Sequence, residues 1–260
     1  MSATVRHGTW PPLPGAEPFE YPGDPDLGAL LVHGFTGSPG ELRPVGEALA
    51  AADIGSAGVL LRGHGTHPND MVGRTYAEWI EDVEQGLERL LERHRRAVVV
   101  GLSMGGTLAL NVAARRADDP RLAGLVTISA PLFLSDWRLG LVGVISRIVK
   151  WQAWGRPDIK DRRVWDTHGA YRRIRTAAIP QLLGLMRETN QRLARVGQPI
   201  LVVHAREDHI VPPGNLDRIR DGVASRVKSS MLLDNCYHVS TVDFEAERLN
   251  AEIVRFIRNL

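Results

Sequence analysis

The sequence predicts an α/β fold, in which a mainly parallel sheet is flanked by helices and carries an inserted helical cap. Short apolar runs of strand length alternate with segments of helical periodicity along most of the 260 residues. Several of these runs are apolar without polar alternation, which is typical of parallel strands covered by helices on both faces. Residues 132–192 break this rhythm, because they offer helical stretches and no convincing strand.

The apolar runs and the periodic segments give the expected elements in order. The expected strands are Glu17–Tyr21, Ala29–His33, Gly58–Leu61, Ala97–Leu102, Leu122–Ser129, Pro199–Ala205 and Lys228–Leu233. The main expected helices are Glu41–Ala52, Tyr76–His94, Met104–Arg116 and Phe244–Ile257. We therefore expect a core domain from residues 1–131 and 193–260, with a helical cap over 132–192. In such sheets ligands lie at the carboxyl ends of the strands.

Composition limits the classes of protein that fit. Hydrophobic residues make up 43% and charged residues 24%, which is ordinary for one globular core. A formal net charge of +2 lacks the excess of a nucleic-acid binder. Cys236 is the only cysteine, so an internal disulfide is excluded and a reducing cytoplasm fits. No apolar run approaches the length of a signal peptide or a membrane span, so we expect a soluble, cytoplasmic protein.

A candidate nucleophile lies between an expected strand and an expected helix. Residues 101–105 read GLSMG and match the G-x-S-x-G turn, in which a serine is exposed on a strained strand-to-helix connection. Glycines are needed on both sides because a β-carbon there would collide with the neighbouring backbone. This context predicts Ser103 as a nucleophile. The alternative is a packed turn in which Ser103 only caps the helix.

Chain order supplies candidates for an acid and a base. A Ser, Asp, His order is typical of this turn, and Asp208 follows an apolar strand while His238 lies in the loop before the last helix. Asp208 would orient the imidazole of His238, and His238 would take the Ser103 proton. Other carboxylates lie near enough in the sequence to compete with Asp208; they are Glu207, Asp234 and Asp243.

Acyl transfer also requires donors for the developing negative charge on oxygen. Met104 follows the nucleophile directly, and Phe35 lies in the glycine-rich stretch HGFTG after an expected strand. We expect their backbone N–H groups to form the oxyanion hole. His33 and His64 are interpreted as residues that fasten these loops rather than as proton carriers.

Four motifs together resemble the small bacterial carboxylesterase and monoacylglycerol lipase group of the α/β-hydrolase superfamily: LLVHGFTGSP, VVVGLSMGG, AREDHIVPP and YHVSTVD. The resemblance covers roughly residues 27–258 and implies the α/β-hydrolase fold, with Ser103, Asp208 and His238 as catalytic residues. Ala205 and Tyr237 stand where glycine is usual in that group. Tyr237 is larger than glycine and lies next to His238, so it can narrow the leaving-group side of the site. The resemblance therefore says less about the substrate than about the catalytic residues.

The expected cap is rich in tryptophan and in positive charge. We predict that Trp137, Trp151 and Trp154, with Ile210 beside the acid, bind an apolar substrate. The alternative is that the tryptophans only pack the cap onto the core. Residues 133–192 hold 12 Lys or Arg against 5 Asp or Glu. Such a surface is commonly just solvated, although it also suits transient docking on anionic lipid or recognition of an anionic group.

The sequence thus predicts a serine carboxylesterase that hydrolyses short-to-medium-chain esters, including monoacylglycerols, through an acyl-Ser103 intermediate. It needs no metal or organic cofactor, its partner is a small ester or lipid, and it binds no nucleic acid. Two alternatives stay open: a thioesterase or carbon–carbon bond hydrolase with the same triad, and a non-catalytic ligand-binding protein. Haloalkane and epoxide hydrolysis fit poorly, because they need an aspartate where Ser103 stands.

Overall fold

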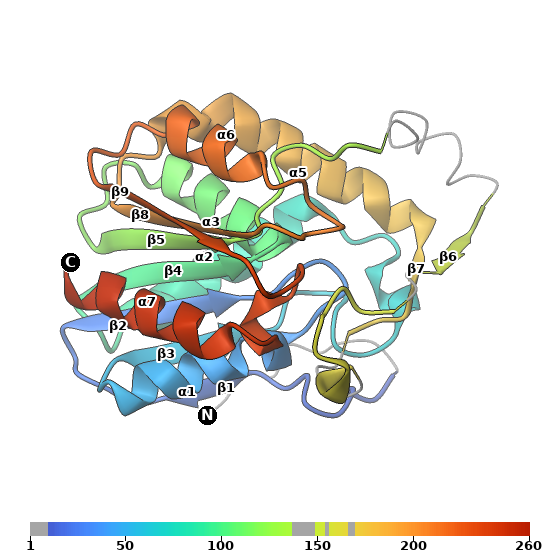
Figure 1. Cartoon of the computed structure of the whole chain (residues 1–260), viewed down its shortest axis with the longest axis horizontal. Coiled ribbons are helices and arrows are strands. Elements are labelled where there is room, and N and C mark those ends of the chain that lie inside the picture. The colour runs from blue at the N-terminus through green and yellow to red at the C-terminus, as the bar shows by residue number, and fades with distance from the viewer. Residues whose placement is uncertain (1–9, 137–148, 154–155, 166–169) are drawn as a thin grey trace.

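A twisted seven-stranded sheet runs through the centre of the protein (Figure 1). The computed structural model describes residues 10–136, 149–153, 156–165 and 170–260. The strands lie in the order β1-β3-β2-β4-β5-β8-β9, and all neighbours pair in parallel except β1, which is antiparallel to β3. Their bounds are β1 Phe19–Tyr21, β2 Leu27–Val32, β3 Gly55–Val59, β4 Arg96–Leu102, β5 Leu122–Ile128, β8 Ile200–Ala205 and β9 Lys228–Leu233. The predicted fold class is confirmed.

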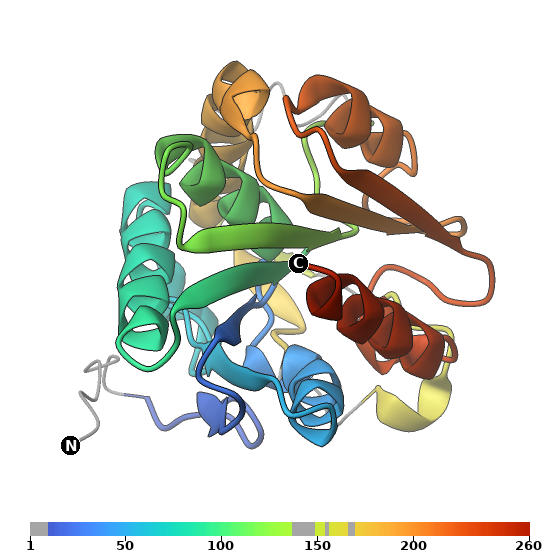
Figure 2. The same ribbon diagram turned by 90° about the vertical axis from the view of Figure 1, so that its left-hand side faces the viewer.

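Helices cover both faces of the sheet, as Figure 2 shows along the strands. On one face lie α1 (Arg43–Ala51) and α7 (Ala246–Arg258), whose apolar side chains share a cluster with alternate residues of the central strands. A second cluster joins the other face to four helices, α2 Tyr76–Leu91, α3 Met104–Arg115, α5 Ile179–Arg192 and α6 Asn215–Gly222. Within the described ranges, no helix is long and apolar enough to cross a membrane.

The observed strand ends agree with the sequence-based bounds to within about two residues, except at β3. This strand begins at Gly55, three residues before the predicted start. The strand reads GSAGV, and its first side chains are too small and too polar to be recognised as an apolar run. The small residues are required by packing, because a Cβ at Gly55 would meet His94 and one at Gly58 would meet Phe19.

The inserted region is not entirely helical, which corrects the prediction. Strands β6 (Trp151–Ala153) and β7 (Arg173–Arg175) pair in an antiparallel ribbon. Each has three residues, and their aromatic and charged side chains give no period-two apolar signal. Short 3-10 helices are found at Pro39–Leu42, Pro68–Met71, Arg162–Val164, Thr176–Ala178, Leu193–Arg195 and Ser240–Val242.

Helix α5 belongs to the core layer, although the predicted cap boundary at residue 192 includes it. It packs against α3 and α2, with Leu185 and Met186 buried in the core cluster. A hydrogen bond of 3.1 Å from Asn111 Nδ2 on α3 to Thr189 Oγ1 ties the two helices together. The limits of the cap remain a prediction, and this packing favours ending the cap before Ile179.

Candidate active site

Ser103 occupies a sharp turn between β4 and α3. Its backbone has φ 53° and ψ −121°, a conformation that L-residues rarely adopt. The flanking glycines are sterically required, because a Cβ at Gly105 would overlap the Val32 carbonyl and one at Gly101 would overlap the Gly105 carbonyl. The predicted strand–serine–helix turn is therefore present, and it lifts the serine hydroxyl to the carboxyl edge of the sheet.

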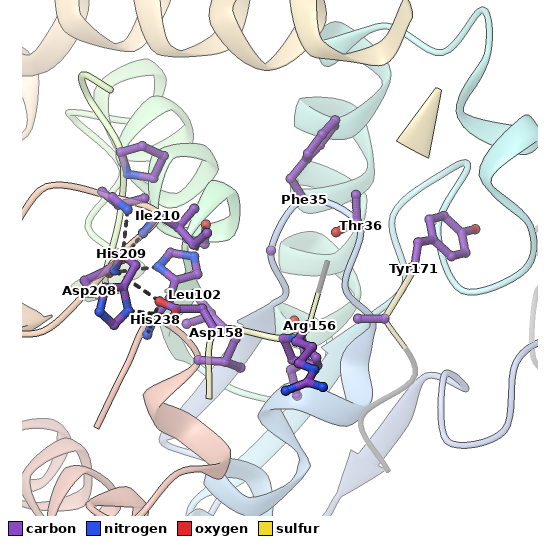
Figure 3. Close-up of a pocket in the computed structure, with 18 of the residues that line it drawn as sticks. Phe35, Thr36, Leu102, Arg156, Asp158, Tyr171, Asp208, His209, Ile210 and His238 are labelled. Atoms are coloured by element: carbon purple, nitrogen blue, oxygen red, sulfur yellow. Dashed lines mark hydrogen bonds and ion pairs between the residues drawn. The ribbon is translucent and has the colours of Figure 1, made fainter. Parts of the chain in front are cut away.

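The three predicted catalytic side chains meet in a continuous hydrogen-bonded chain. Figure 3 shows Asp208 and His238 side by side in it. His238 Nε2 lies 2.9 Å from Ser103 Oγ, and His238 Nδ1 lies 2.8 Å from Asp208 Oδ2. Asp208 comes from the loop after β8 and His238 from the loop after β9. Positions 103, 208 and 238 thus converge because β4, β8 and β9 run parallel and end at one edge.

Asp208 is surrounded by donors that suit a carboxylate. Its Oδ1 accepts the N–H groups of Ile210 and Val211 at 2.9 and 2.8 Å, while Oδ2 faces His238 and, at 3.3 Å, His204 Nε2. Burial opposes ionisation, but the His238 charge and these hydrogen bonds outweigh it and hold the pKa of Asp208 well below its usual range. This carboxyl group is therefore ionised at neutral pH.

The competing carboxylates lie elsewhere. Glu207 forms an ion pair with Lys160, and Asp234 forms one with Arg206. Asp243 is buried and accepts backbone N–H groups of its own loop and of the inserted region; these donors are Lys160, Asp161, Tyr237 and Phe244. Asp208 is the carboxylate that the structure brings to the imidazole of His238.

His238 is nearly buried, which disfavours its charged form. The negative charges of Asp208 and Asp158 act in the opposite direction and raise the pKa of His238 above its ordinary value. An imidazole in this setting readily accepts a proton from the serine hydroxyl, because the resulting imidazolium is stabilised by two carboxylates.

The glycine-rich loop after β2 passes beside the serine. A Cβ placed on Gly34 would lie 3.2 Å from Ser103 Cβ. Leu61 N–H donates to His33 Nε2 at 3.1 Å, so His33 Nδ1 carries the proton and donates to the Gly34 carbonyl at 2.9 Å. Burial lowers the pKa of His33 to about 4, so its ring is neutral. These contacts agree with the interpretation of His33 as a fastening residue.

The two expected oxyanion donors lie in the loop after β2 and at the start of α3. Phe35 lines the cavity at the serine, and the following Thr36 has a φ of 68°, which turns the loop backbone. Met104 is the first residue of α3, so its N–H is one of the helix-terminal donors that lack a partner within the helix. The assignment of both N–H groups to an oxyanion hole remains a prediction.

Glu41 is a buried carboxyl group beside this loop that sequence reasoning missed. It is 5% exposed, it lines the cavity with Ser103, and its carboxyl group is hydrogen-bonded to the Gly34 backbone. A Cβ at Gly37 would overlap that carboxyl group. Burial raises the pKa of Glu41 to about 8, so the side chain is protonated at neutral pH. In the sequence, Glu41 reads as an ordinary residue at a helix start.

We expect the stability of the protein to fall as the pH rises from about 5 to 9, in part because of Glu41. The folded state holds this proton until about pH 8, whereas an unfolded glutamate releases it near pH 4.5. Ionisation therefore costs the folded state on the order of 5 kcal/mol above pH 8. Glu41→Gln removes the titration, so its stability relative to the wild type should increase across this range.

Urea unfolding at pH 5, 7 and 9 measures this effect, with Glu47→Gln on the exposed side of α1 as the matched control. Parallel stability profiles for the wild type and Glu41→Gln would show that Glu41 does not titrate in this window.

A cavity of about 820 Å³ opens beside the serine, a volume that suits a small organic ligand. Of the predicted substrate-binding residues, Ile210 lines this cavity. Trp151 does not, because its ring packs against Arg173, Arg175 and His67. Trp137 and Trp154 lie outside the described residues. Trp165, which the prediction did not select, lines the cavity and donates its Nε1–H to the Ile159 carbonyl.

The sheet order, the serine turn and the converging side chains define an α/β-hydrolase. Residues 23–245 match the family described as "Serine aminopeptidase, S33", and the chain belongs to this family. The thermostable monoacylglycerol lipase of Bacillus sp. (strain H-257) is 39% identical over 91% of this chain and 92% of its own length. The carboxylesterase of Bacillus subtilis (strain 168) is 23% identical over 94% and 97%.

Solved structures agree with this assignment. One from a study of the metagenome-derived lipolytic enzymes LipS and LipT has a TM-score of 0.91 and 34% identity, over 96% of this chain and 100% of the other. A monoglyceride lipase of Saccharomyces cerevisiae, at 14% identity and a TM-score of 0.79 over 98% of both chains, shares the fold. The chain is thus an α/β-hydrolase of the lipase and esterase type.

Proposed function

We propose that the protein hydrolyses short-to-medium-chain carboxylic esters, including monoacylglycerols, with Ser103 as nucleophile, His238 as base and Asp208 as acid. The observation that carries this proposal is the unbroken chain from Asp208 through His238 to the Ser103 hydroxyl, which faces a cavity of about 820 Å³. Geometry of this kind supports acyl transfer, because the base lies within hydrogen-bond reach of the proton that it removes.

In the first half of the reaction, Ser103 Oγ attacks the ester carbonyl carbon while its proton passes to His238 Nε2. The negative charge moves to the carbonyl oxygen, where the N–H groups of Phe35 and Met104 stabilise it. The tetrahedral intermediate then collapses. The carbon–oxygen bond to the alcohol breaks, the alcohol takes the proton from His238 Nε2, and an acyl ester remains on Ser103.

In the second half, water replaces the alcohol. His238 Nε2 removes a proton from the water as its oxygen bonds to the acyl carbon, and the same proton returns to Ser103 Oγ as the acyl–serine bond breaks. The carboxylic acid is released and the serine is restored. Asp208 remains ionised throughout, because its hydrogen bonds hold its pKa low, and it keeps the imidazole oriented.

The choice of substrate is supported by the cavity and by the relatives. Apolar side chains form one part of the wall, among them Leu134, Ile179 and Leu182, and they suit an acyl chain. Arg156 and Asp158 contribute polar groups to the same cavity, which suits a small polar alcohol. A monoacylglycerol lipase is among the relatives, at 39% identity over most of both chains.

The test is a series of p-nitrophenyl esters from acetate to palmitate, with monoacylglycerols and acyl-CoA thioesters assayed in parallel. We expect the highest kcat/KM on esters of short to medium chain, and labelling by a fluorophosphonate that mass spectrometry locates on Ser103. Preferential turnover of acyl-CoA would favour the thioesterase alternative. A folded protein that hydrolyses none of these substrates and takes no label would contradict the proposal.

A further inference from the structure

The inserted region reaches directly into the loops that carry the acid and the base. Figure 3 shows Asp158 beside His209 and His238, and all three line the cavity. Its Oδ2 accepts the backbone N–H of His238 at 3.2 Å and that of His209 at 3.1 Å. Its Oδ1 accepts His209 Nδ1 at 2.8 Å, and its own carbonyl accepts Val239 N–H at 3.2 Å. One residue thus holds both loops.

The neighbours of Asp158 strengthen the same attachment. Ile159 is buried in the apolar cluster that contains α1 and α7, and Lys160 forms an ion pair with Glu207 in the acid loop. The N–H groups of Lys160 and Asp161 donate to Asp243, which follows His238 in the chain. The segment 158–161 is therefore joined to the acid loop and to the base loop by side chains and by backbone.

The charge of Asp158 also faces the imidazole. Three carboxyl groups surround His238: Asp208 from the loop after β8, Asp158 from the inserted region and Glu41 from the helix start after β2. Glu41 is protonated below about pH 8. At neutral pH, Asp158 is thus the second negative charge that acts on His238, and its side chain is 14% exposed, so solvent screens it only in part.

We propose that Asp158 is a positioning residue, which fixes the base loop against the acid loop and supplies a second negative charge toward His238. The proposal rests on the proposed function, because it assigns Asp158 a role in the reaction of Ser103. The inserted region would then take part in catalysis, because it sets the position of the base. A shift of this segment moves the His238 backbone, and with it the Nε2 atom that must reach the serine.

Asp158→Asn tests the proposal, because an amide keeps the size of the side chain but loses the charge and one acceptor. Misplacement of the base by even 1 Å costs about 100-fold, so we expect kcat for a p-nitrophenyl ester to fall about 10- to 100-fold, with a smaller change in KM. The pH at which the rate is half-maximal should fall by about 0.5 unit, because the imidazolium loses a stabilising charge.

The matched control is Asp161→Asn, three residues away, where the carboxylate accepts hydrogen bonds from Arg163. It should leave both readouts unchanged. Asp158→Glu keeps the charge at a longer reach, and should retain the wild-type pH midpoint while kcat falls. If Asp158→Asn does not fold, the kcat and the pH midpoint of Asp158→Glu test the proposal in its place. Fluorophosphonate labelling of Ser103 is followed against pH in the same four proteins, and its midpoint should shift as in the ester assay.

If Asp158→Asn behaves as Asp161→Asn does, in rate and in pH midpoint, Asp158 is a surface attachment and the proposal is overturned. If Asp158→Glu lowers the pH midpoint of the rate as much as Asp158→Asn does, the charge of Asp158 does not act on His238, and that part of the proposal is overturned. A wild-type protein that is inert toward both esters and fluorophosphonate would instead overturn the proposed function, and this inference with it.

Discussion

Replacing Ser103 by alanine is expected to lower kcat for ester hydrolysis by about 10⁶-fold. The change removes the atom that forms the acyl bond and leaves His238 without the hydroxyl that it contacts at 2.9 Å. Folding should be preserved, because alanine fits the space and the strained turn is set by Gly101 and Gly105. Steady-state rates on the best p-nitrophenyl ester, with circular dichroism to check the fold, measure the effect.

The double variant Ser103→Ala/His238→Ala sharpens this test. Residues that act as one unit are not additive, so the double variant should be no slower than Ser103→Ala alone. Retention of more than about one per cent of the rate in Ser103→Ala would assign the chemistry to another nucleophile. An intermediate loss with further loss in the double variant would mean that His238 acts independently of Ser103.

Asp208→Asn is expected to lower kcat by about 10⁴-fold through a change of tautomer. In the native site, Oδ1 accepts the N–H groups of Ile210 and Val211, so the oxygen of an asparagine stays on that side. Its amide nitrogen then faces His238 Nδ1 and donates to it. The ring is left with its proton on Nε2, which can no longer accept the proton of the serine.

The pH dependence distinguishes this explanation from simple disruption. The Asp208→Asn variant also lacks the charge that stabilises the imidazolium, so its His238 titration should move to lower pH while the rate stays low. A kcat within tenfold of the wild type would contradict the role of Asp208. Asp234→Asn is the control, because Asp234 is exposed and forms its ion pair with Arg206 rather than with the imidazole.

The sequence was informative wherever a local pattern determined structure. The apolar runs predicted the strands because a parallel strand buried on both faces must be apolar along its length. The serine turn was predictable because steric overlap forces glycine at positions 101 and 105. Asp208 and His238 were predictable because loops at the carboxyl ends of parallel strands share one edge of the sheet.

The sequence carries no signal for residues whose role depends on contacts with residues far away in the chain. Asp158 contacts His209 and His238, which lie 51 and 80 residues further along the chain, and nothing in its own neighbourhood marks it. Glu41 is unusual only because it is buried. The surroundings of Trp151 were hidden for the same reason, because an aromatic residue in a cap fits a cavity and a cationic surface equally well until Arg173 and Arg175 are seen beside it.

The catalytic base, His238, follows a strand at the edge of the sheet. β9 lies at the border of the sheet, pairs on one side only, and is the least buried of its parallel strands, whereas Ser103 follows the central strand β4. Border strands open locally at a lower free energy than central strands. Fraying of β9 therefore withdraws His238 while the nucleophile and the core remain in place. We therefore expect activity to be lost on heating before the fold melts, because detachment of this one strand is enough to remove the base.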